Sequence, residues 1–374
     1  MVKLYEPSAC CGCMACGDIC PVGAITSSTD DRGFIYPHVD GNLCVDCQAC
    51  VNVCAFKGEK NTEKNILHAY AFQLTDKEQL RQSTSGGAFV ALSDEILAEG
   101  GVVIGACMED DFTVAHRIAD DKDGRDAMRM SKYAQSTTGG IFAAVEKLLK
   151  DGKKVMFIGT PCQCGELRRY IGDSDRLLVC DFLCHGVPST AFLKEHIRYL
   201  EEYYHKTAAA YTFRGKRYGW NHGIEEITFT DGSRKDNKRV QSYAKFFQSG
   251  VSLRESCRHC VYRSHHRPSD ITIADFWGYE KITGQKDHQG VSLILANSEN
   301  GKQYVGRIAA HGTLTEVDVD RVLYRVATTP AKSRINVSDF WDIYSKEGYK
   351  GVVKKYAEPS FKETIKHELK KRLL

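Results

Sequence analysis

Eight cysteines near the start of the chain have the spacing of iron–sulfur cluster ligands. The pattern Cys-x2-Cys-x2-Cys-x3-Cys occurs twice, at Cys10, Cys13, Cys16 and Cys20 and again at Cys44, Cys47, Cys50 and Cys54. In such a doubled run, three thiolates of each half bind one Fe4S4 cluster and the fourth ligates the other cluster. The two predicted ligand sets are therefore Cys10, Cys13, Cys16 and Cys54, and Cys20, Cys44, Cys47 and Cys50. The chemistry that these residues predict is the transfer of single electrons.

Two other uses of these cysteines fit the sequence less well. A disulfide framework belongs to an oxidising compartment, but the chain begins Met1-Val2-Lys3-Leu4 without an apolar signal segment. Zinc sites usually combine two close cysteine pairs that are separated by a longer loop. The doubled run is instead typical of a bacterial two-cluster ferredoxin domain. Its one departure is Ala55, which stands where the first run has Pro21.

A second group of cysteines follows predicted strands further along the chain. Cys162 lies in the predicted turn Gly159-Thr160-Pro161-Cys162-Gln163, between a strand over 155–158 and a helix over 166–170, and Cys184 follows a strand over 177–183. The carboxyl ends of parallel strands are where α/β proteins place their sites. With the Cys-x2-Cys pair at Cys257 and Cys260, these thiolates predict a site for zinc or for a third Fe4S4 cluster. The preceding ferredoxin run favours iron.

The remaining cysteines and a neighbouring histidine have simpler interpretations. Cys107 and Cys180 lie on apolar strands and are expected in the core. Cys11 and Cys164 each adjoin a better placed ligand and are interpreted as spare. His185, next to Cys184, is either a proton donor or a hydrogen-bonded structural residue.

Two Ser/Thr-Gly-Gly segments each open a predicted helix. Residues 83–87 precede a helix over 88–97 and a strand over 102–107, and residues 136–140 precede a helix over 141–149. A helix N-terminus favours anions because its amides are free and its dipole is positive there, and glycine lets a ligand approach. Lys132 and Tyr133 would add a cation and a ring. Helix capping explains the same residues equally well, so the residues alone leave both interpretations open.

The rest of the chain must hold these groups in place. After a linker over 57–67, strands and helices alternate, which predicts a mixed α/β or α+β fold with parallel-leaning strands. The 374 residues exceed what one hydrophobic core usually organises, so several domains are expected. The basic C-terminal segment predicts an amphipathic helix with Phe361, Ile365 and Leu369 on one face.

Charge and hydropathy exclude two classes of partner. The 51 basic and 48 acidic residues leave a formal charge of only +3, which gives no field for recruiting nucleic acid. Apolar runs such as 102–107 are far shorter than the about 18 residues that a membrane span needs. We therefore expect a soluble, cytoplasmic protein.

Six motifs within residues 68–280 resemble the beta subunits of coenzyme F420-reducing hydrogenases and F420-linked formate dehydrogenases. They are Ser83-Thr84-Ser85-Gly86-Gly87, Ser131-Lys132-Tyr133-Ala134-Gln135-Ser136, Gly159-Thr160-Pro161-Cys162-Gln163, Cys184-His185-Gly186-Val187-Pro188, Cys257-x2-Cys260 and Ile273-Ala274-Asp275-Phe276-Trp277-Gly278. Ala274 departs from the glycine common there in relatives. The resemblance implies a flavoprotein with FAD near Ser85, Gly86, Gly87, Lys132, Tyr133 and Ser136, and a cluster at Cys162, Cys184, Cys257 and Cys260.

The resemblance also implies the domain organisation. A bacterial-type dicluster ferredoxin domain over 1–62 is followed by a mixed α/β flavin-binding domain, whose N-terminal region is 63–155 and whose C-terminal region with the third cluster is 156–345. Residues 346–374 form the basic C-terminal helix.

The expected function is that of an iron–sulfur flavoprotein oxidoreductase. Electrons would pass between ferredoxin, or a partner subunit, and a small-molecule hydride donor or acceptor such as coenzyme F420, through 4Fe-4S clusters and FAD. The sequence assigns no catalytic acid or base. One alternative is a non-catalytic electron-transfer subunit of a larger redox complex, and another is a zinc-stabilised binding module attached to a ferredoxin domain.

Overall fold

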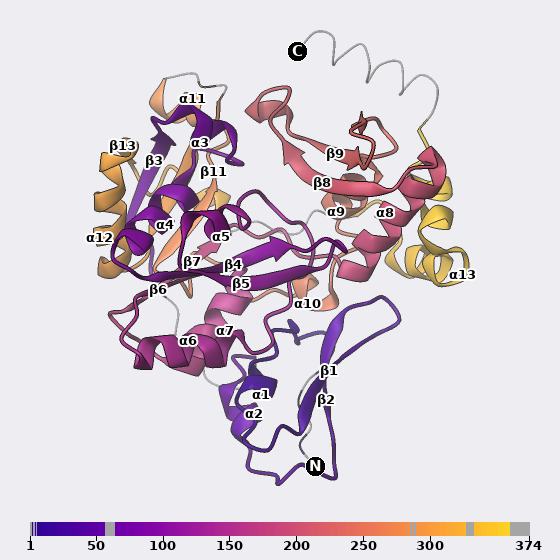
Figure 1. Cartoon of the computed structure of the whole chain (residues 1–374), viewed down its shortest axis with the longest axis horizontal. Coiled ribbons are helices and arrows are strands. Elements are labelled where there is room, and N and C mark those ends of the chain that lie inside the picture. Colours follow the sequence, from indigo (N-terminus) through magenta and orange to yellow (C-terminus); the bar gives the residue numbers. More distant parts are fainter. Residues whose placement is uncertain are drawn as a thin grey trace.

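A mixed sheet of eight strands organises most of the chain in a computed structural model (Figure 1). The structure describes residues 2, 4, 6–56, 64–284, 287, 289–326 and 333–359. The strand order is β13-β3-β12-β11-β7-β6-β4-β5. The strands are β3 (His68–Leu74), β4 (Val102–Met108), β5 (Val114–Ala119), β6 (Val155–Gly159), β7 (Leu177–Phe182), β11 (Ile271–Asp275), β12 (Ser292–Ala296) and β13 (Gly312–Val317).

The four central strands of this sheet are parallel, and the outer strands pair antiparallel. Strands β4, β6, β7 and β11 run in one direction, so the carboxyl ends of β6, β7 and β11 share one edge. Strand β5 pairs antiparallel with β4, and β12, β3 and β13 extend the other side in the same antiparallel manner. The expectation of a mixed α/β fold with parallel-leaning strands is thereby confirmed.

Helices cover both faces of the large sheet. On one face, α4 (Ala88–Ala98) and α12 (Glu299–Arg307) pack over Val103, Met156 and Leu178. On the opposite face, α6 (Ile141–Lys150) and α7 (Pro161–Ile171) pack over the alternate residues of the same strands. The central strands are largely apolar because both of their faces are buried. Shorter helices are α3 (Lys77–Arg81), α5 (Lys122–Asp126) and α11 (Tyr279–Thr283).

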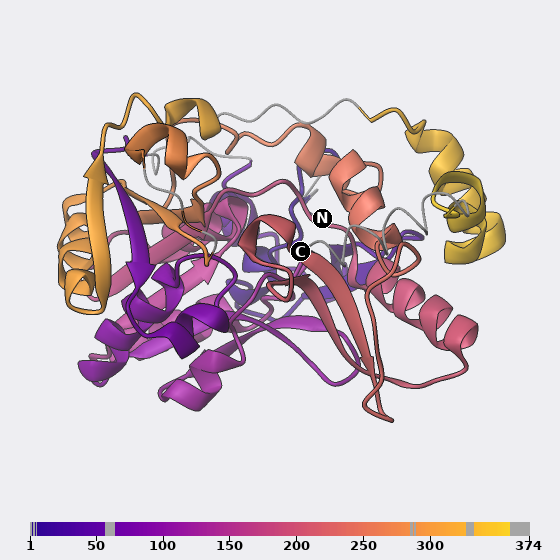
Figure 2. The same ribbon diagram turned by 90° about the horizontal axis from the view of Figure 1, so that it is seen from above.

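A smaller antiparallel sheet lies beside the large one (Figure 2). Its strands are β8 (Ala208–Gly215), β9 (Ile224–Phe229) and β10 (Arg234–Lys235). The helices around it are α8 (Thr190–Tyr204), α9 (Ser242–Ser249), α10 (Glu255–Arg258) and α13 (Val337–Tyr356), the last interrupted by a non-helical Gly348. Aromatic side chains form much of this second core, including Phe192, Phe246 and Tyr349.

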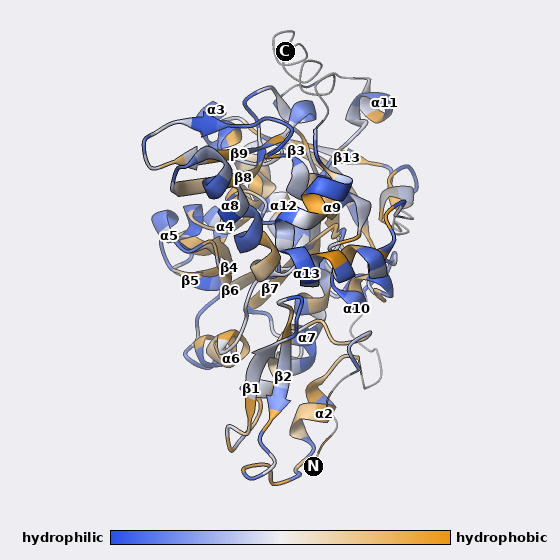
Figure 3. Cartoon of the chain, turned by 90° about the vertical axis from the view of Figure 1, so that its right-hand side faces the viewer, coloured by the Kyte–Doolittle hydropathy of each residue, from blue (hydrophilic) through white to orange (hydrophobic). Residues whose placement is uncertain are grey.

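The N-terminal residues form a separate small lobe below α6 and α7 (Figures 1 and 3). It contains the hairpin β1 (Ile25–Thr29) and β2 (Ile35–Val39) and the short helices α1 (Ala15–Asp18) and α2 (Ala49–Val53). Both short helices contact α7, and α1 also contacts α6. We call this part, residues 6–56, the dicluster lobe.

The observed bounds of several elements lie close to the predicted ones. Helices α4 and α6 begin at the predicted residues. The predicted boundary between residues 155 and 156 falls inside β6, and strands from both predicted regions share the large sheet. The division of residues 63–345 therefore stays a prediction from sequence. Of the C-terminal helix predicted over 346–374, residues 346–356 belong to α13, which begins earlier, at Val337, and residues 360–374 lie outside the described residues. Within the described part, no helix has the length and apolar character of a membrane span.

Candidate iron–sulfur and cofactor sites

One set of four cysteines surrounds a cavity at the far end of the dicluster lobe. Cys20 comes from the first run. It lines this cavity together with three cysteines of the second run, Cys44, Cys47 and Cys50. The structure therefore brings together the residues of one predicted ligand set, across the two runs. Apolar residues complete the lining, among them Val22 and Val45. Cys47 is exposed, so this distal set lies at the surface.

The other predicted set lies on the side of the lobe that faces the large sheet. Cys16 has Cys10 and Cys54 as electrostatic neighbours. Burial, and then the proximity of these two thiols, raises the pKa of Cys16 to about 12. The structure therefore places Cys16 beside Cys10 and Cys54, two other members of the predicted set.

The third group of cysteines assembles at the edge where β6 and β7 end. Cys184 follows β7, Cys257 lies on α10, and Cys260 follows that helix. Burial, and then the nearby thiols of Cys257, Cys162 and Cys260, raises the pKa of Cys184 well above its usual value. The structure thus brings the four predicted residues together. We call them the inner set.

The local structure around Cys162 differs from the prediction. We expected a tight turn over 159–163 and a helix only from Glu166, but α7 already begins at Pro161. Thr160 is its N-cap, and Gln163 completes a capping box by accepting from the Thr160 amide. Proline at the first helical position suits this start because it has no amide hydrogen to satisfy. Cys162 therefore lies in the first helical turn, which fixes its direction.

The distances between the sulfur atoms of the inner set can be compared with those of a zinc site. Among the described residues, the only group of three or more possible donors with all ligand atoms within 4.8 Å is Cys11, Cys13 and Glu166. No three sulfurs of the inner set are that close. A tetrahedral zinc ion with Zn–S bonds of about 2.3 Å would hold its sulfurs about 3.8 Å apart.

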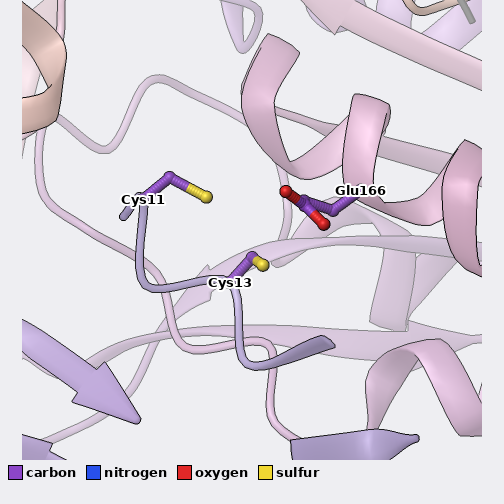
Figure 4. Close-up of side chains that lie close together, drawn as sticks. All are labelled: Cys11, Cys13 and Glu166. Atoms are coloured by element: carbon purple, nitrogen blue, oxygen red, sulfur yellow. The ribbon is translucent and has the colours of Figure 1, made fainter. Parts of the chain in front are cut away.

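Cys11, in the dicluster lobe, lies close to Cys13 and to Glu166 of α7 (Figure 4). A hydrogen bond with Cys13 raises the pKa of Cys11 well above its usual value, burial adds to this, and a hydrogen bond with Cys162 opposes it. Glu166 reaches the same place from α7, and its carboxylate accepts from the Ala55 amide at 3.1 Å. The sequence analysis interpreted Cys11 as spare. No local pattern signals its neighbours, because Cys162 and Glu166 are distant along the chain.

The first Ser-Gly-Gly segment packs against two strands. The Ser85 hydroxyl donates to the Val291 carbonyl at 2.7 Å, and the Gly86 amide donates to Oγ of Ser292 at 3.0 Å. A Cβ on Gly86 would lie 2.1 Å from the Phe72 carbonyl oxygen. Gly87, the N-cap of α4, has φ 86°, a left-handed conformation that favours glycine. This segment is a helix cap that is closely packed on β3 and β12.

The second segment binds an anion that belongs to the chain itself. The Gly140 amide donates to Oδ1 of Asp18 at 2.7 Å, and the Phe142 amide donates to Oδ2 at 3.0 Å. Asp18 comes from the dicluster lobe. The physical argument for an anion at the start of α6 therefore applies, but the anion is a carboxylate that docks the lobe. Ser136 accepts from Nε2 of Gln163 at 3.0 Å and so supports α7.

Lys132 and Tyr133 lie near the first segment. The Thr84 and Ser131 hydroxyl oxygens are 3.5 Å apart, and Tyr133 stacks on Phe247 with ring centroids 4.6 Å apart. Nζ of Lys132 donates to the Arg129 carbonyl at 2.6 Å, and burial lowers the pKa of Lys132 to about 8. Of the residues expected to lie near FAD, the structure brings residues 84–85 close to residues 131–133. Ser136 lies elsewhere, at the start of α7.

Lys216, which the sequence analysis did not select, reaches the same segment. Its Nζ donates to the carbonyls of Ser85 at 2.6 Å, Gln289 at 2.8 Å and Leu80 at 3.0 Å. Burial lowers the pKa of Lys216 to about 8. The nearby carboxylates of Asp275 and Asp287 oppose this lowering. The ammonium groups of Lys132 and Lys216 thus lie near this segment, and each donates to backbone carbonyl oxygens.

Cysteine sets of this spacing, joined to an α/β body, define an iron–sulfur electron-transfer protein. Residues 9–57 match the family of 4Fe-4S dicluster domains. Residues 152–322 match the family described as the C terminus of the coenzyme F420 hydrogenase/dehydrogenase beta subunit. These two matches confirm the resemblance inferred from the motifs, the first over residues 9–57 and the second over residues 152–322.

Two individual proteins are also similar to the chain. It is 28% identical over 104 residues to an indoleacetate decarboxylase activating enzyme of Tractidigestivibacter scatoligenes, a match that covers 25% of this chain and 31% of that protein. The chain thus spans less than a third of that relative's length. A chain of the F420-reducing [NiFe] hydrogenase complex from Methanosarcina barkeri superposes with a TM-score of 0.44 and 15% identity, over 80% of this chain and 94% of that one.

Proposed function

We propose that the chain is an iron–sulfur flavoprotein oxidoreductase. It exchanges electrons with ferredoxin or a partner subunit and exchanges hydride with an organic molecule such as coenzyme F420 or another small substrate. Bound Fe4S4 clusters supply one-electron transfer, and bound FAD supplies conversion to two-electron chemistry. The observation that carries the proposal is the contact of Cys11 with both Cys13 and Cys162, which joins the lobe to the inner set.

The residues between the lobe and the body hold this contact at a fixed distance. Arg254 is fully buried, and its guanidinium donates to the carbonyls of Cys10 at 2.7 Å and Ile35 at 2.9 Å. Thr138 donates to the Cys13 carbonyl at 2.6 Å. The bonds from the Arg254 guanidinium are charge-assisted, which makes them stronger than bonds between neutral groups and orients both partners. The lobe therefore supplies electrons to one place on the body.

The third metal site is proposed to hold iron rather than zinc. Its four thiols are mutual neighbours, yet no three of their sulfurs approach as closely as zinc requires. An Fe4S4 cluster has a separate iron atom for each thiolate and suits wider spacing.

FAD is proposed to bind beside Thr84, Ser131, Lys132 and Lys216 rather than on the helix starts themselves. Both glycine-rich helix starts already use their amides within the chain. The ammonium groups of Lys132 and Lys216 hydrogen-bond to carbonyl oxygens and would be neutralised by a diphosphate. The ring of Tyr133 lies in the same region as an apolar neighbour.

Metal and flavin analysis after anaerobic purification tests the proposal. We expect about 12 iron atoms, from three clusters of four, and one FAD per chain. About 8 iron atoms with one zinc would contradict the third cluster. The purified chain should also turn over a small hydride donor or acceptor with a viologen as electron partner. Full cofactor content without any turnover would instead favour the non-catalytic subunit.

A further inference from the structure

One side of the dicluster lobe is already covered by the body. Asp18 caps α6, Arg254 binds two carbonyls of the lobe, and Nε2 of Gln135 donates to the Cys11 carbonyl at 3.2 Å. Glu166 approaches the Ala55 amide from α7. A separate protein therefore cannot approach the lobe from this side.

The opposite end of the lobe exposes apolar side chains around the distal cysteine set. Val22, Leu43 and Val45 are 43%, 52% and 62% exposed, and they are three of the eight large hydrophobic residues that the described part of the chain exposes. Val22 and Val45 also line the distal cavity. Figure 3 shows hydrophobic residues on the loops at this end of the molecule. We call residues 20–24 and 40–48 the distal loops.

The charged residues within the distal loops all have one sign. Residues 17–29 and 39–53 contain no Lys or Arg. Their acidic residues are Asp18, whose carboxylate caps α6, and Asp40 and Asp46, which flank Leu43 and Val45. A partner would thus meet an apolar centre with a negative rim. Clustered apolar residues at an otherwise polar surface commonly mark an interaction site.

We propose that the distal loops are the docking surface for a separate electron-carrier protein, whose own face is apolar at its centre and carries Lys or Arg at its rim. The inference rests on the proposed function, because it needs metal at the distal cysteines. Transient redox complexes have small interfaces, and complementary charge at the rim speeds their association. Each encounter passes one electron between the carrier and the chain.

The test compares two double variants with a matched control. Leu43→Ser with Val45→Ser removes the apolar centre, and Asp40→Asn with Asp46→Asn removes the negative rim. Asn keeps the acceptor oxygen that Asp40 offers to the Asn42 amide, and it tolerates the left-handed φ of 57° at Asp46. Ile118→Ser on β5, 46% exposed and outside the lobe, is the control.

The measurement is the anaerobic rate at which dithionite-reduced protein reduces a basic c-type cytochrome, with one electron passing to each ferric haem. We expect the apolar variant to react about tenfold more slowly and the charge variant to lose most of its salt dependence. Ile118→Ser should match the unaltered protein. Each cytochrome rate is compared with the rate at which the same variant reduces methyl viologen, because so small an acceptor needs no docking surface and reports any damage to the cavity that Val45 and Asp46 line.

Iron content and electron paramagnetic resonance spectra of each variant separate the two proposals. Unchanged cytochrome rates in iron-replete variants would overturn the docking surface and leave the proposed function intact. A faster reaction with an acidic ferredoxin than with the basic cytochrome would also overturn it. Absence of iron from the distal set of the unaltered protein would overturn the proposed function itself.

Discussion

Asp18 shows how a single side chain can connect two parts of a protein. It lies at the end of α1, two residues from the nearest cysteines of the first run. Its two carboxylate oxygens accept from two amides at the start of α6, an arrangement that satisfies donors which a helix otherwise leaves unpaired. The positive end of the helix dipole adds a favourable charge interaction.

Replacing Asp18 by alanine should therefore loosen the lobe. We expect Asp18→Ala to lower the free energy of unfolding by about 1–2 kcal/mol, the usual cost of losing a carboxylate helix cap. Urea unfolding of the iron-loaded protein measures the change. Asp31→Ala, at an exposed carboxylate in the same lobe, should stay within about 0.5 kcal/mol. Equal effects at both positions would show that Asp18 does not hold the lobe.

At the scale of single residues, the sequence indicated which cysteines lie together but not which side chains contact one another across the fold. Cysteine spacing indicated which thiols lie together, because in a doubled run of this spacing three thiols of each run share a site with the fourth thiol of the other run. It could not identify Asp18 as the anion at α6 or Cys11 as a neighbour of Cys162, because both contacts join segments that are remote in sequence.

The two Ser/Thr-Gly-Gly helix starts look alike in sequence but have different surroundings. At Gly86, an added Cβ would meet the Phe72 carbonyl at 2.1 Å and the Ser292 amide nitrogen at 2.4 Å. At Gly139, the corresponding first glycine of the second segment, no atom lies within 4 Å of such a Cβ. The first start is confined between two strands, and the second start faces open space at this residue.

This difference predicts opposite outcomes for one substitution. Gly86→Ala should lower the free energy of unfolding by about 1–3 kcal/mol or more, because backbone atoms of β3 and β12 cannot move aside cheaply. Gly139→Ala should change it by less than about 0.5 kcal/mol. Thermal and urea unfolding of both variants give the comparison. An unchanged free energy of unfolding for Gly86→Ala would show that the backbone of β3 and β12 can move to make room for the added methyl group.

At the scale of elements, apolar runs and glycine pairs predicted the helices and central strands near their observed bounds. The start of α7 was missed because its Thr160–Gln163 capping box and Pro161 were interpreted as a turn. The pairing of β12 with β3, and of β3 with β13, could not be predicted. These strands come from opposite ends of the body, and their hydropathy alone does not identify a partner.

The whole molecule arranges its three cysteine sets from the distal loops to the edge of the large sheet. The distal set is exposed at the end of the lobe, the second faces the body, and the inner set lies where β6 and β7 end. The inner set is linked to the residues proposed to bind FAD, since His185 next to Cys184 contacts Phe247, on which Tyr133 stacks.

Loss of the inner set should interrupt electron transfer from the lobe to the flavin and leave the two cysteine sets of the lobe unaffected. We expect Cys257→Ser to reduce iron to about 8 atoms per chain, to keep the ferredoxin absorption, and to slow flavin reduction by a reductant that acts through the lobe. Cys107→Ala, at a buried cysteine outside the three sets, should keep full iron. Flavin reduction at the original rate in Cys257→Ser would contradict the proposed route.

The position of Arg254 has a consequence for how the protein is made. Arg254 is the N-cap of α10, the short helix that carries Cys257, and its guanidinium also binds the carbonyls of Cys10 and Ile35. One short segment therefore carries a cysteine of the inner set and also binds the lobe. We expect metal insertion at the inner set and docking of the lobe to be coupled, because each restricts this same segment.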